Sequence, residues 1–293
     1  MWTYLIFIFS LCMSVVSCGQ ENRNVKFFKG TEAYELARAV EKKNLEAIEK
    51  LVKENPKLLS ITNETTGSNI LKLSLTLENF DTFKKLLELG ADPNFINYYS
   101  RRSILIEACK FYNKPEPYTI DLRYIELLLK YGANPNYSVE EDFTDEKGHY
   151  QRATSAIHEA SRLDLGMVKL LIKYGADPYK KLKQHQDPPF YEALTGFKNR
   201  IEISNYFIDS LKVNIKEPLA IFENKETKKK NVLYIQDVVV NKFLKAKLNG
   251  NTEEMEKLKE ENPNIEKANQ KDWEFIQKLE KMGVDFKNYH YKK

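Results

Sequence analysis

The chain has 293 residues and a formal net charge of +4, from 46 Lys and Arg against 42 Asp and Glu residues. Acidic and basic residues are interspersed along it, so the composition excludes a strongly basic surface that would hold nucleic acid by charge alone. The length allows one long repeat array or two compact domains.

The N-terminus has the pattern of a secretory signal. Residues 1–17 are almost wholly apolar and carry no charged side chain, and a polar segment follows them. The apolar run is shorter than the roughly 20 residues that a membrane-spanning helix needs. We therefore expect residues 1–17 to be a signal peptide, with an uncleaved N-terminal anchor as the alternative.

Val15-Val16-Ser17-Cys18 closes this signal and resembles a bacterial lipobox. The resemblance implies that Cys18 accepts lipid, carries palmitate and becomes the mature N-terminus, with residues 18–30 as a lipidated tether. The start of the signal departs from the pattern because it has no Lys or Arg, and in an ordinary signal Cys18 would be incidental. The residue after the Cys is Gly19 rather than Asp, and this resembles lipoproteins that are sent on to the outer membrane. We therefore expect the bacterial envelope, and its outer rather than its inner membrane.

Short apolar stripes recur along the next part of the chain. Five segments carry apolar or small residues with the i, i+3, i+4 spacing of one buried helix face. These triplets begin at Leu36, Leu71, Leu105, Ile157 and Phe190. Each is followed by a second stripe of larger apolar residues, which begins at Ile48, Phe83, Ile125, Val168 or Ile203. The pattern predicts five helix-turn-helix units.

Three of these units end in almost the same phrase, in which Gly-Ala is followed by Asp or Asn and then by Pro. The three copies are 86–94, 128–136 and 171–179. Gly permits the left-handed turn after a helix, Asp or Asn bonds its own turn, and Pro prevents a return to helix. Asn55-Pro56 takes the place of Gly-Ala in the first unit, and we expect Asn55 in the same left-handed conformation.

These units resemble the ankyrin repeat, and the segment Ser155-Ala156-Ile157-His158-Glu159-Ala160 is similar to that family's Thr-Pro-Leu-His-x-Ala opening. The resemblance covers residues 31–214 as about five repeats. It implies an all-α fold, an ankyrin-repeat α-solenoid of about six repeats in which hairpin loops join the helix pairs. It also implies that the connecting loops form a binding edge.

The spacing of the units departs from the family's period of about 33 residues. Gly90, Gly132 and Gly175 are 42 and 43 residues apart. One insertion falls around 114–121, and another lengthens the loop between Asn136 and Thr154. A long loop there indicates a functional elaboration, although loops also tolerate insertions without function.

Beyond Asn214 the pattern lapses, and it returns near residue 241. Two apolar segments within 218–235 flank a polar stretch, which favours a small β-hairpin or two helix fragments in an irregular insert at 215–240. We interpret residues 241–293 as a C-terminal repeat and a capping helix, from Trp273 to Met282, that covers the last face of the array.

No catalytic constellation is apparent. His158 occupies the position of the family's structural His, which ties its repeat to neighbouring backbone, and Cys109 lies on a buried stripe. With Cys12 in the signal and Cys18 lipidated, Cys109 has no disulfide partner in the mature chain. We expect no metal, no cofactor and no enzymatic activity.

Acidic residues crowd the long loop at 140–146. Asp142 and Glu146 hint at calcium, but Gly148 comes one place late for an EF-hand and Ala153 stands where the closing Glu is needed. A solvated acidic loop is the favoured interpretation.

Aromatic and Arg side chains gather in the expected connecting loops. Tyr and Arg are the residue types that most often carry interface energy. The candidates for partner binding are Phe95, Tyr98, Tyr99, Arg101, Arg102, Tyr137, Phe143, Tyr150, Arg152 and Tyr179. If the loops stack at the repeat spacing, these side chains form one continuous edge. The alternative is that several of them pack back on their own hairpins.

The leading functional hypothesis is a non-enzymatic, monomeric protein–protein interaction module anchored to the bacterial envelope. It would bind a protein partner through its concave edge and the long loop at 137–153, and no nucleic acid. A sharper version is an immunity or inhibitor protein against a toxin or an envelope enzyme. Two alternatives remain, a metal-binding or enzymatic envelope protein that uses the acidic 140–146 loop and a structural spacer.

Overall fold

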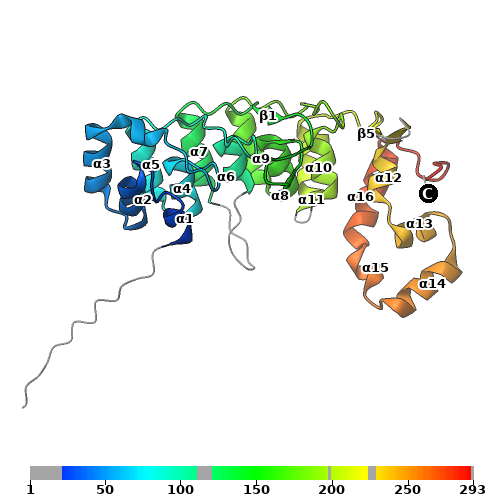
Figure 1. Cartoon of the computed structure of the whole chain (residues 1–293). Coiled ribbons are helices and arrows are strands. Elements are labelled where there is room, and N and C mark those ends of the chain that lie inside the picture. Colours follow the sequence, from blue (N-terminus) through cyan, green and yellow to red (C-terminus); the bar gives the residue numbers. More distant parts are fainter. Residues whose placement is uncertain (1–21, 111–120, 197–198, 224–228, 292–293) are drawn as a thin grey trace, which may run out of the picture.

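Pairs of short helices account for most of the structure. A computed structural model describes residues 22–110, 121–196, 199–223 and 229–291. The helix pairs lie side by side in one elongated row, with the N-terminal pairs at one end and the C-terminal helices at the other (Figure 1). One continuous hydrophobic core runs through the row, from Val25 to Phe286.

The five predicted helix-turn-helix units are all present. Their first helices are α2 (Tyr34–Glu41), α4 (Ile70–Thr76), α6 (Ile104–Lys110), α8 (Ala156–Leu163) and α10 (Pro189–Thr195). Their second helices are α3 (Leu45–Glu54), α5 (Phe80–Glu88), α7 (Leu122–Lys130), α9 (Leu165–Lys173) and α11 (Arg200–Asn205), the last continued by a π-helical turn, η2 (Tyr206–Ser210). First helices pack on first helices, as α8 does on α10, and second helices on second helices, as α5 does on α7. The predicted apolar triplets are buried in all five first helices.

Asn and Asp residues fix where the second helices begin. The side-chain oxygen of Asn44 accepts the backbone N–H of Ala47 at 3.0 Å, and that of Asp164 accepts the N–H of Met167 at 2.8 Å. Each such cap satisfies a backbone donor at the helix end and contributes about 1 kcal/mol. The turn between the two helices of a unit is therefore determined by residues close to it in the sequence.

The repeated helix ends have the predicted left-handed geometry. Gly90, Gly132 and Gly175 have φ angles of 94°, 87° and 89°, a region that other residues enter only at a cost of about 1–2 kcal/mol. The prediction for Asn55 is wrong, because its φ is −143°. Asn55 instead accepts the backbone N–H of Lys57 and begins a 3-10 helix, η1 (Pro56–Leu59). Pro56 has no backbone N–H, so it fits the first position of that helix, where an N–H would have no partner within the helix.

The strands of the described residues are three short antiparallel ribbons in the loops. β1 (Ser138–Val139) pairs with β4 (Thr154–Ser155), and β2 (Phe143–Thr144) pairs with β3 (Tyr150–Gln151) between them. β5 (Ala220–Glu223) pairs with β6 (Lys230–Leu233). The β-hairpin expected within 218–235 is thus observed, and its tip, 224–228, lies outside the described residues.

The start of the described chain is packed, so the expectation of a tether is wrong for residues 22–30. Residues 23–26 form a helical turn, α1 (Arg23–Lys26), that packs on α2. Val25 and Phe28 are fully buried, because they cover the outer face of the first pair. The predicted signal peptide at 1–17 and Cys18 lie outside the described residues. Within the described ranges, no helix has both the length and the apolar character needed to cross a membrane.

The C-terminal helices include the predicted helix pair and last helix, but they pack differently from a repeat followed by a cap. They are α12 (Ile235–Val239), α13 (Lys242–Leu248), α14 (Thr252–Glu261), α15 (Ile265–Ala268) and α16 (Gln270–Lys281). α12 packs on α10 and α16 packs on α11, so these two continue the row, while α13 and α14 pair with each other. The segment from α13 to α15 leaves the row between them (Figure 1). Charge strengthens the contact of α16 with the row, since Lys278 Nζ donates to Asp209 Oδ2 at 2.7 Å.

Candidate functional site

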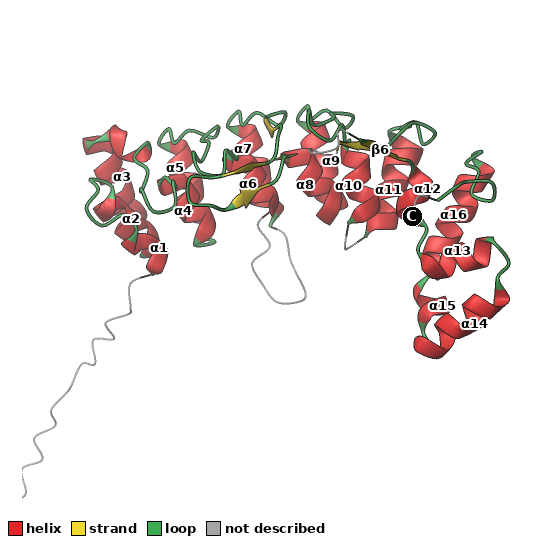
Figure 2. Cartoon of the chain, turned by 45° about the vertical axis from the view of Figure 1, so that its right-hand side comes forward, coloured by secondary structure: helices red, strands yellow, loops and turns green. Residues whose placement is uncertain are grey.

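The loops that join successive helix pairs gather along one edge of the row (Figure 2). We call this surface the connector edge. It consists of the first connector (61–69), the second connector (92–103), the finger (136–155), the third connector (177–188) and the β5–β6 hairpin. All ten predicted partner-binding residues lie on these segments.

Asn residues that follow the repeated Pro tie each turn to the next one. Asn94 donates from Nδ2 to the carbonyl of Gly132 at 3.0 Å and accepts the N–H of Asn134 at 2.7 Å. Asn136 repeats this pattern with Gly175 and Asp177, at 2.8 Å for both bonds. Sequence reasoning missed this role, although the Pro-Asn pair that carries it is visible in two of the three repeated endings.

The finger packs against the second connector through three of the predicted residues. The Arg101 guanidinium lies 4.2 Å from the centroid of the Phe143 ring, and the Tyr137 hydroxyl donates to the carbonyl of Arg101 at 2.7 Å. Such a cation–π contact contributes about 0.5–1 kcal/mol at an exposed site. These side chains therefore brace the loops against each other.

The tip of the finger reaches further, to the first connector. Lys147 Nζ lies 3.9 Å from the centroid of the Tyr99 ring and donates to the carbonyl of Glu64 at 3.3 Å. The Tyr99 hydroxyl donates to the same carbonyl at 2.7 Å. Gly67 permits this close approach, since a Cβ there would lie 3.0 Å from the rings of Tyr98 and Tyr99.

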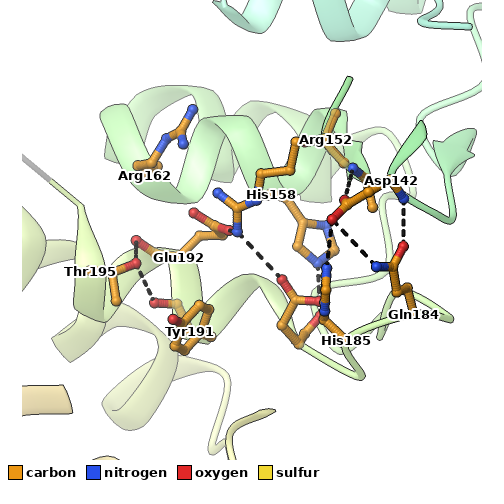
Figure 3. Close-up of polar contacts among 12 residues, drawn as sticks. Asp142, Arg152, His158, Arg162, Gln184, His185, Tyr191, Glu192 and Thr195 are labelled. Atoms are coloured by element: carbon orange, nitrogen blue, oxygen red, sulfur yellow. Dashed lines mark hydrogen bonds and ion pairs between the residues drawn. The ribbon is translucent and has the colours of Figure 1, made fainter. Parts of the chain in front are cut away.

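Asp142 joins the finger to the third connector (Figure 3). Its carboxylate accepts bonds from the Ala153 N–H at 2.8 Å, from the Tyr150 hydroxyl at 2.5 Å and from His185 Nε2 at 3.0 Å. Burial acts to raise the pKa of Asp142, but these hydrogen bonds outweigh it and hold the pKa below its ordinary value. The backbone N–H of Asp142 also donates to the third connector, at Gln184 Oε1.

The expectation of a solvated acidic loop is wrong for Asp142 and Asp145, whose side chains are 10% and 4% exposed. Asp145 accepts the N–H groups of Lys147 and His149 at 3.0 and 2.9 Å, and it accepts Gln151 Nε2 at 3.1 Å. These donors belong to the finger itself, so both carboxylates shape the loop. Among the described residues, no group of three or more His, Cys, Asp or Glu side chains could hold a metal ion.

His158 has the structural role predicted for it. Its Nδ1 lies 2.7 Å from Ser155 Oγ and its Nε2 lies 3.0 Å from the carbonyl oxygen of Asp187, so one ring connects α8 to the third connector. The side chain is buried, and burial lowers the pKa of His158. Cys109 is buried in α6, and burial raises the pKa of its thiol, which disfavours the nucleophilic thiolate form.

Arg152 lies beside two buried carboxylates (Figure 3). Its Nη2 is 2.5 Å from Glu192 Oε1 and 3.8 Å from Asp187 Oδ2, while the two acidic side chains are 6% and 1% exposed. Burial raises the pKa of Glu192, against the opposing effect of Arg152. Arg152 thus compensates the negative charge of these two carboxylates, and it joins the finger to α10 and to the third connector.

Four of the predicted residues are exposed, Arg101 and three tyrosines. Tyr98, Tyr150 and Tyr179 are 48%, 66% and 52% exposed. The Tyr98 ring contacts the Tyr99 ring at a tilt of 40°, with centroids 4.1 Å apart, and the Tyr179 hydroxyl donates to the carbonyl of Leu211 at 2.5 Å. Phe95 and Arg102 are partly buried in the second connector. The structure therefore brings the ten residues onto one edge, with most of them holding loops together and three tyrosines facing outward.

Comparisons with known proteins find likenesses among solved structures alone. No protein-family model matches the chain, and no curated protein matches it. Among solved structures, it is similar to the crystal structure of the human ASB11 ankyrin repeat domain, with a TM-score of 0.44 and 18% sequence identity. The likeness covers 61% of this chain and 70% of that one.

Proposed function

We propose that the chain is a non-enzymatic protein-binding module of the ankyrin-repeat type, a solenoid of about six repeats. Support comes from the helix pairs in one row, the repeated Gly-Ala endings and the Ser155 to Ala160 segment. In this proposal α12 and α16 supply the sixth pair, and the α13–α15 segment is an insertion within it. The described residues carry no His, Cys or carboxylate cluster for metal chemistry.

The binding surface in this proposal is the connector edge, and one observation carries the assignment. Tyr98, Tyr150 and Tyr179 stay about half exposed on loops that are hydrogen-bonded to one another. Exposed Tyr on a braced loop loses little conformational entropy when a partner covers it, which favours affinity. The finger contributes in two ways, since it presents Tyr150 and stiffens its neighbours.

The proposed location is the outer membrane of the bacterial envelope, to which a lipid on Cys18 would anchor the protein. Support comes from the sequence alone, namely the apolar run at 1–17 and the small residues before Cys18. Acyl chains contribute about 0.8 kcal/mol per buried methylene, so several chains hold a protein stably on a bilayer.

Site-specific photo-crosslinking in cells that make the full-length protein tests the binding surface. A photoreactive residue is placed at position 98, 150 or 179, and at Leu45 as the control. Leu45 is 37% exposed and begins α3, at the end of the helix pair opposite the connectors. We expect a shared adduct of one size from the three connector positions and none from Leu45. No adduct at the connector positions, or equal adducts from all four, would refute the proposed surface.

A further inference from the structure

A pocket of about 380 Å³ lies where the first helices α4 and α6 meet the first and second connectors, and the tip of the finger closes one side. α6 packs closely on α8, whereas α4 and α6 are held at this point by an ion pair. Lys72 Nζ of α4 donates to Glu107 Oε2 of α6 at 2.5 Å. Figure 2 shows the strands of the finger crossing in front of this part of the row.

The lining of this pocket has more positive charge than its carboxylates neutralise. Lys72, Arg102 and Lys147 line it together with Glu107 and Asp145. Asp145 is 4% exposed and accepts bonds from the turn of the finger, so its acceptor atoms are already engaged. Glu107 is left to face both Lys72 and Arg102.

The hydrogen bonding of Arg102 is incomplete in the described structure. Its side chain is 14% exposed, and its contact with Glu107 is long, at 3.9 Å. Arg102 Nε is buried and has no acceptor among the described residues. A buried donor without an acceptor costs about 1–3 kcal/mol, so a site that keeps one favours the arrival of an acceptor.

Lys147 also brings positive charge to the pocket, and among the described residues no carboxylate forms an ion pair with it. Its Nζ meets the face of the Tyr99 ring and the carbonyl oxygens of Glu64 and Thr65, all of which are uncharged. The long finger therefore delivers a cation to the rim of a pocket that already holds two. The exposed ring of Tyr98 contacts Tyr99 at the same rim and offers an apolar surface beside it.

We propose that this pocket receives a carboxylate side chain from an acidic segment of the protein partner, with a neighbouring apolar side chain resting on Tyr98. Charge complementarity selects the carboxylate, and the aromatic rim selects a peptide over a free small anion. The inference rests on the proposed protein-binding function and adds the chemistry of the partner. Glu107 already pairs with Lys72 and Arg102, so it competes with the partner's carboxylate for these two cations.

A binding measurement with a defined probe tests this. The probe is a blocked, dye-labelled peptide with the order Glu-Phe-Glu between glycines, and its counterpart carries Gln in place of both Glu residues. The full-length protein in detergent is titrated and fluorescence anisotropy is followed. We expect binding of the Glu peptide and at least about tenfold weaker binding of the Gln peptide, as loss of charge-assisted hydrogen bonds implies.

Three variants give the result its direction. Arg102→Gln should weaken binding of the Glu peptide by about tenfold, while Arg123→Gln, at an arginine that is 65% exposed on α7, should leave it unchanged. Glu107→Gln should strengthen binding, because it removes the internal competitor, and misfolding cannot produce such a gain. Equal effects of Arg102→Gln and Arg123→Gln, or weaker binding after Glu107→Gln, would overturn the assignment.

Two further results separate the alternatives. Inorganic phosphate that displaces the peptide at equal concentration would overturn the assignment to a peptide carboxylate. A peptide that does not bind, while the connector positions still give their crosslinked adduct, would refute this inference and leave the proposed function standing. Peptide binding without any such adduct would instead count against the proposed function alone.

Discussion

Lys147 Nζ lies 3.3 Å from the carbonyl oxygen of Glu64, a residue 83 positions earlier in the chain. The contact carries the tip of the finger across the second connector to the first. Together with the bond between Asp142 and His185, it makes one loop touch the connectors on both of its sides. The finger is therefore a brace along the connector edge as well as a part of its surface.

Lys147→Ala should loosen the finger without unfolding the protein. The lost cation–π contact and exposed hydrogen bonds contribute about 1 kcal/mol together. Hydrogen–deuterium exchange should therefore rise across 142–151, with the melting temperature almost unchanged. Lys130→Ala, which removes an exposed pair with Glu126 within one helix, is the matched control. Unchanged exchange in the finger would show that the brace does not depend on Lys147.

His158→Ala should destabilise the fold strongly. The substitution leaves a cavity and removes the ring's two bonds, to Ser155 and to the Asp187 carbonyl, inside the core. We expect a loss of about 2–3 kcal/mol in the free energy of unfolding by urea. The exposed His290, changed to Ala, should alter it by less than about 0.5 kcal/mol. A similarly small change in the free energy of unfolding for both variants would contradict a structural role for His158.

The buried imidazole also predicts a pH dependence. Burial lowers the folded pKa of His158 below the ordinary value of 6.5, so the unfolded chain binds the proton more readily. Stability is thus fully present above pH 6.5 and falls as the pH drops below that value towards the folded pKa. Between pH 7.5 and 5.5 the wild type should lose about 1 kcal/mol more than His158→Gln. Parallel curves for the two proteins would contradict this assignment.

Arg152→Ala should destabilise the protein at neutral pH and do so less in acid. Without Arg152, the buried Glu192 and Asp187 lose their nearest cation, and the pKa of Glu192, already raised by burial, should rise further. A carboxyl with a raised folded pKa loses stability as the pH rises through that pKa. Because Arg152 is 40% exposed, we expect only about 1–2 kcal/mol at pH 7.

The control for this variant is Arg123→Ala, which removes an exposed pair with Asp121. It should change the stability by less than about 0.5 kcal/mol at either pH. A destabilisation by Arg152→Ala that is the same at pH 5 and pH 7 would show that the loss comes from packing and not from charge.

Palmitate labelling tests the proposed anchor. Wild-type protein made in bacteria should take up labelled palmitate and stay with the membrane fraction, because acylation at Cys18 supplies the apolar chains. Cys18→Ser should lose the label, and Cys109→Ser, at a buried core position, should keep it. A label that persists in Cys18→Ser would end the lipoprotein proposal.

The helix pairs could be predicted because their signals are local. The stripe of Leu36, Ala39 and Val40 and the left-handed Gly90 depend on residues within one or two turns of each other. Near 218–235, two apolar segments around a polar one favour either a β-hairpin or two helix fragments, and the structure has the hairpin. Periodicity and turn chemistry carry this information without any knowledge of distant contacts.

The remainder depended on contacts that spacing does not encode. Asp142 is held by His185, 43 positions later, so its acidic neighbourhood gave no sign that it is buried. The packing of α16 on α11 depends on an excursion of the chain from α13 to α15. Val25 and Phe28 belong to a turn too short for a periodic signal.

The central claim is that the outward-facing tyrosines of the connector edge bind a protein partner. Its most direct test is a crosslinked pull-down with the full-length protein, comparing wild type, the triple variant Tyr98→Ala, Tyr150→Ala, Tyr179→Ala, and the control Leu45→Ala. Large aromatic anchors carry about 2 kcal/mol or more each at an interface, so recovery of the partner should fall at least about tenfold in the triple variant. It should stay at the wild-type level in the control. Equal recovery by the triple variant and the wild type would contradict the claim.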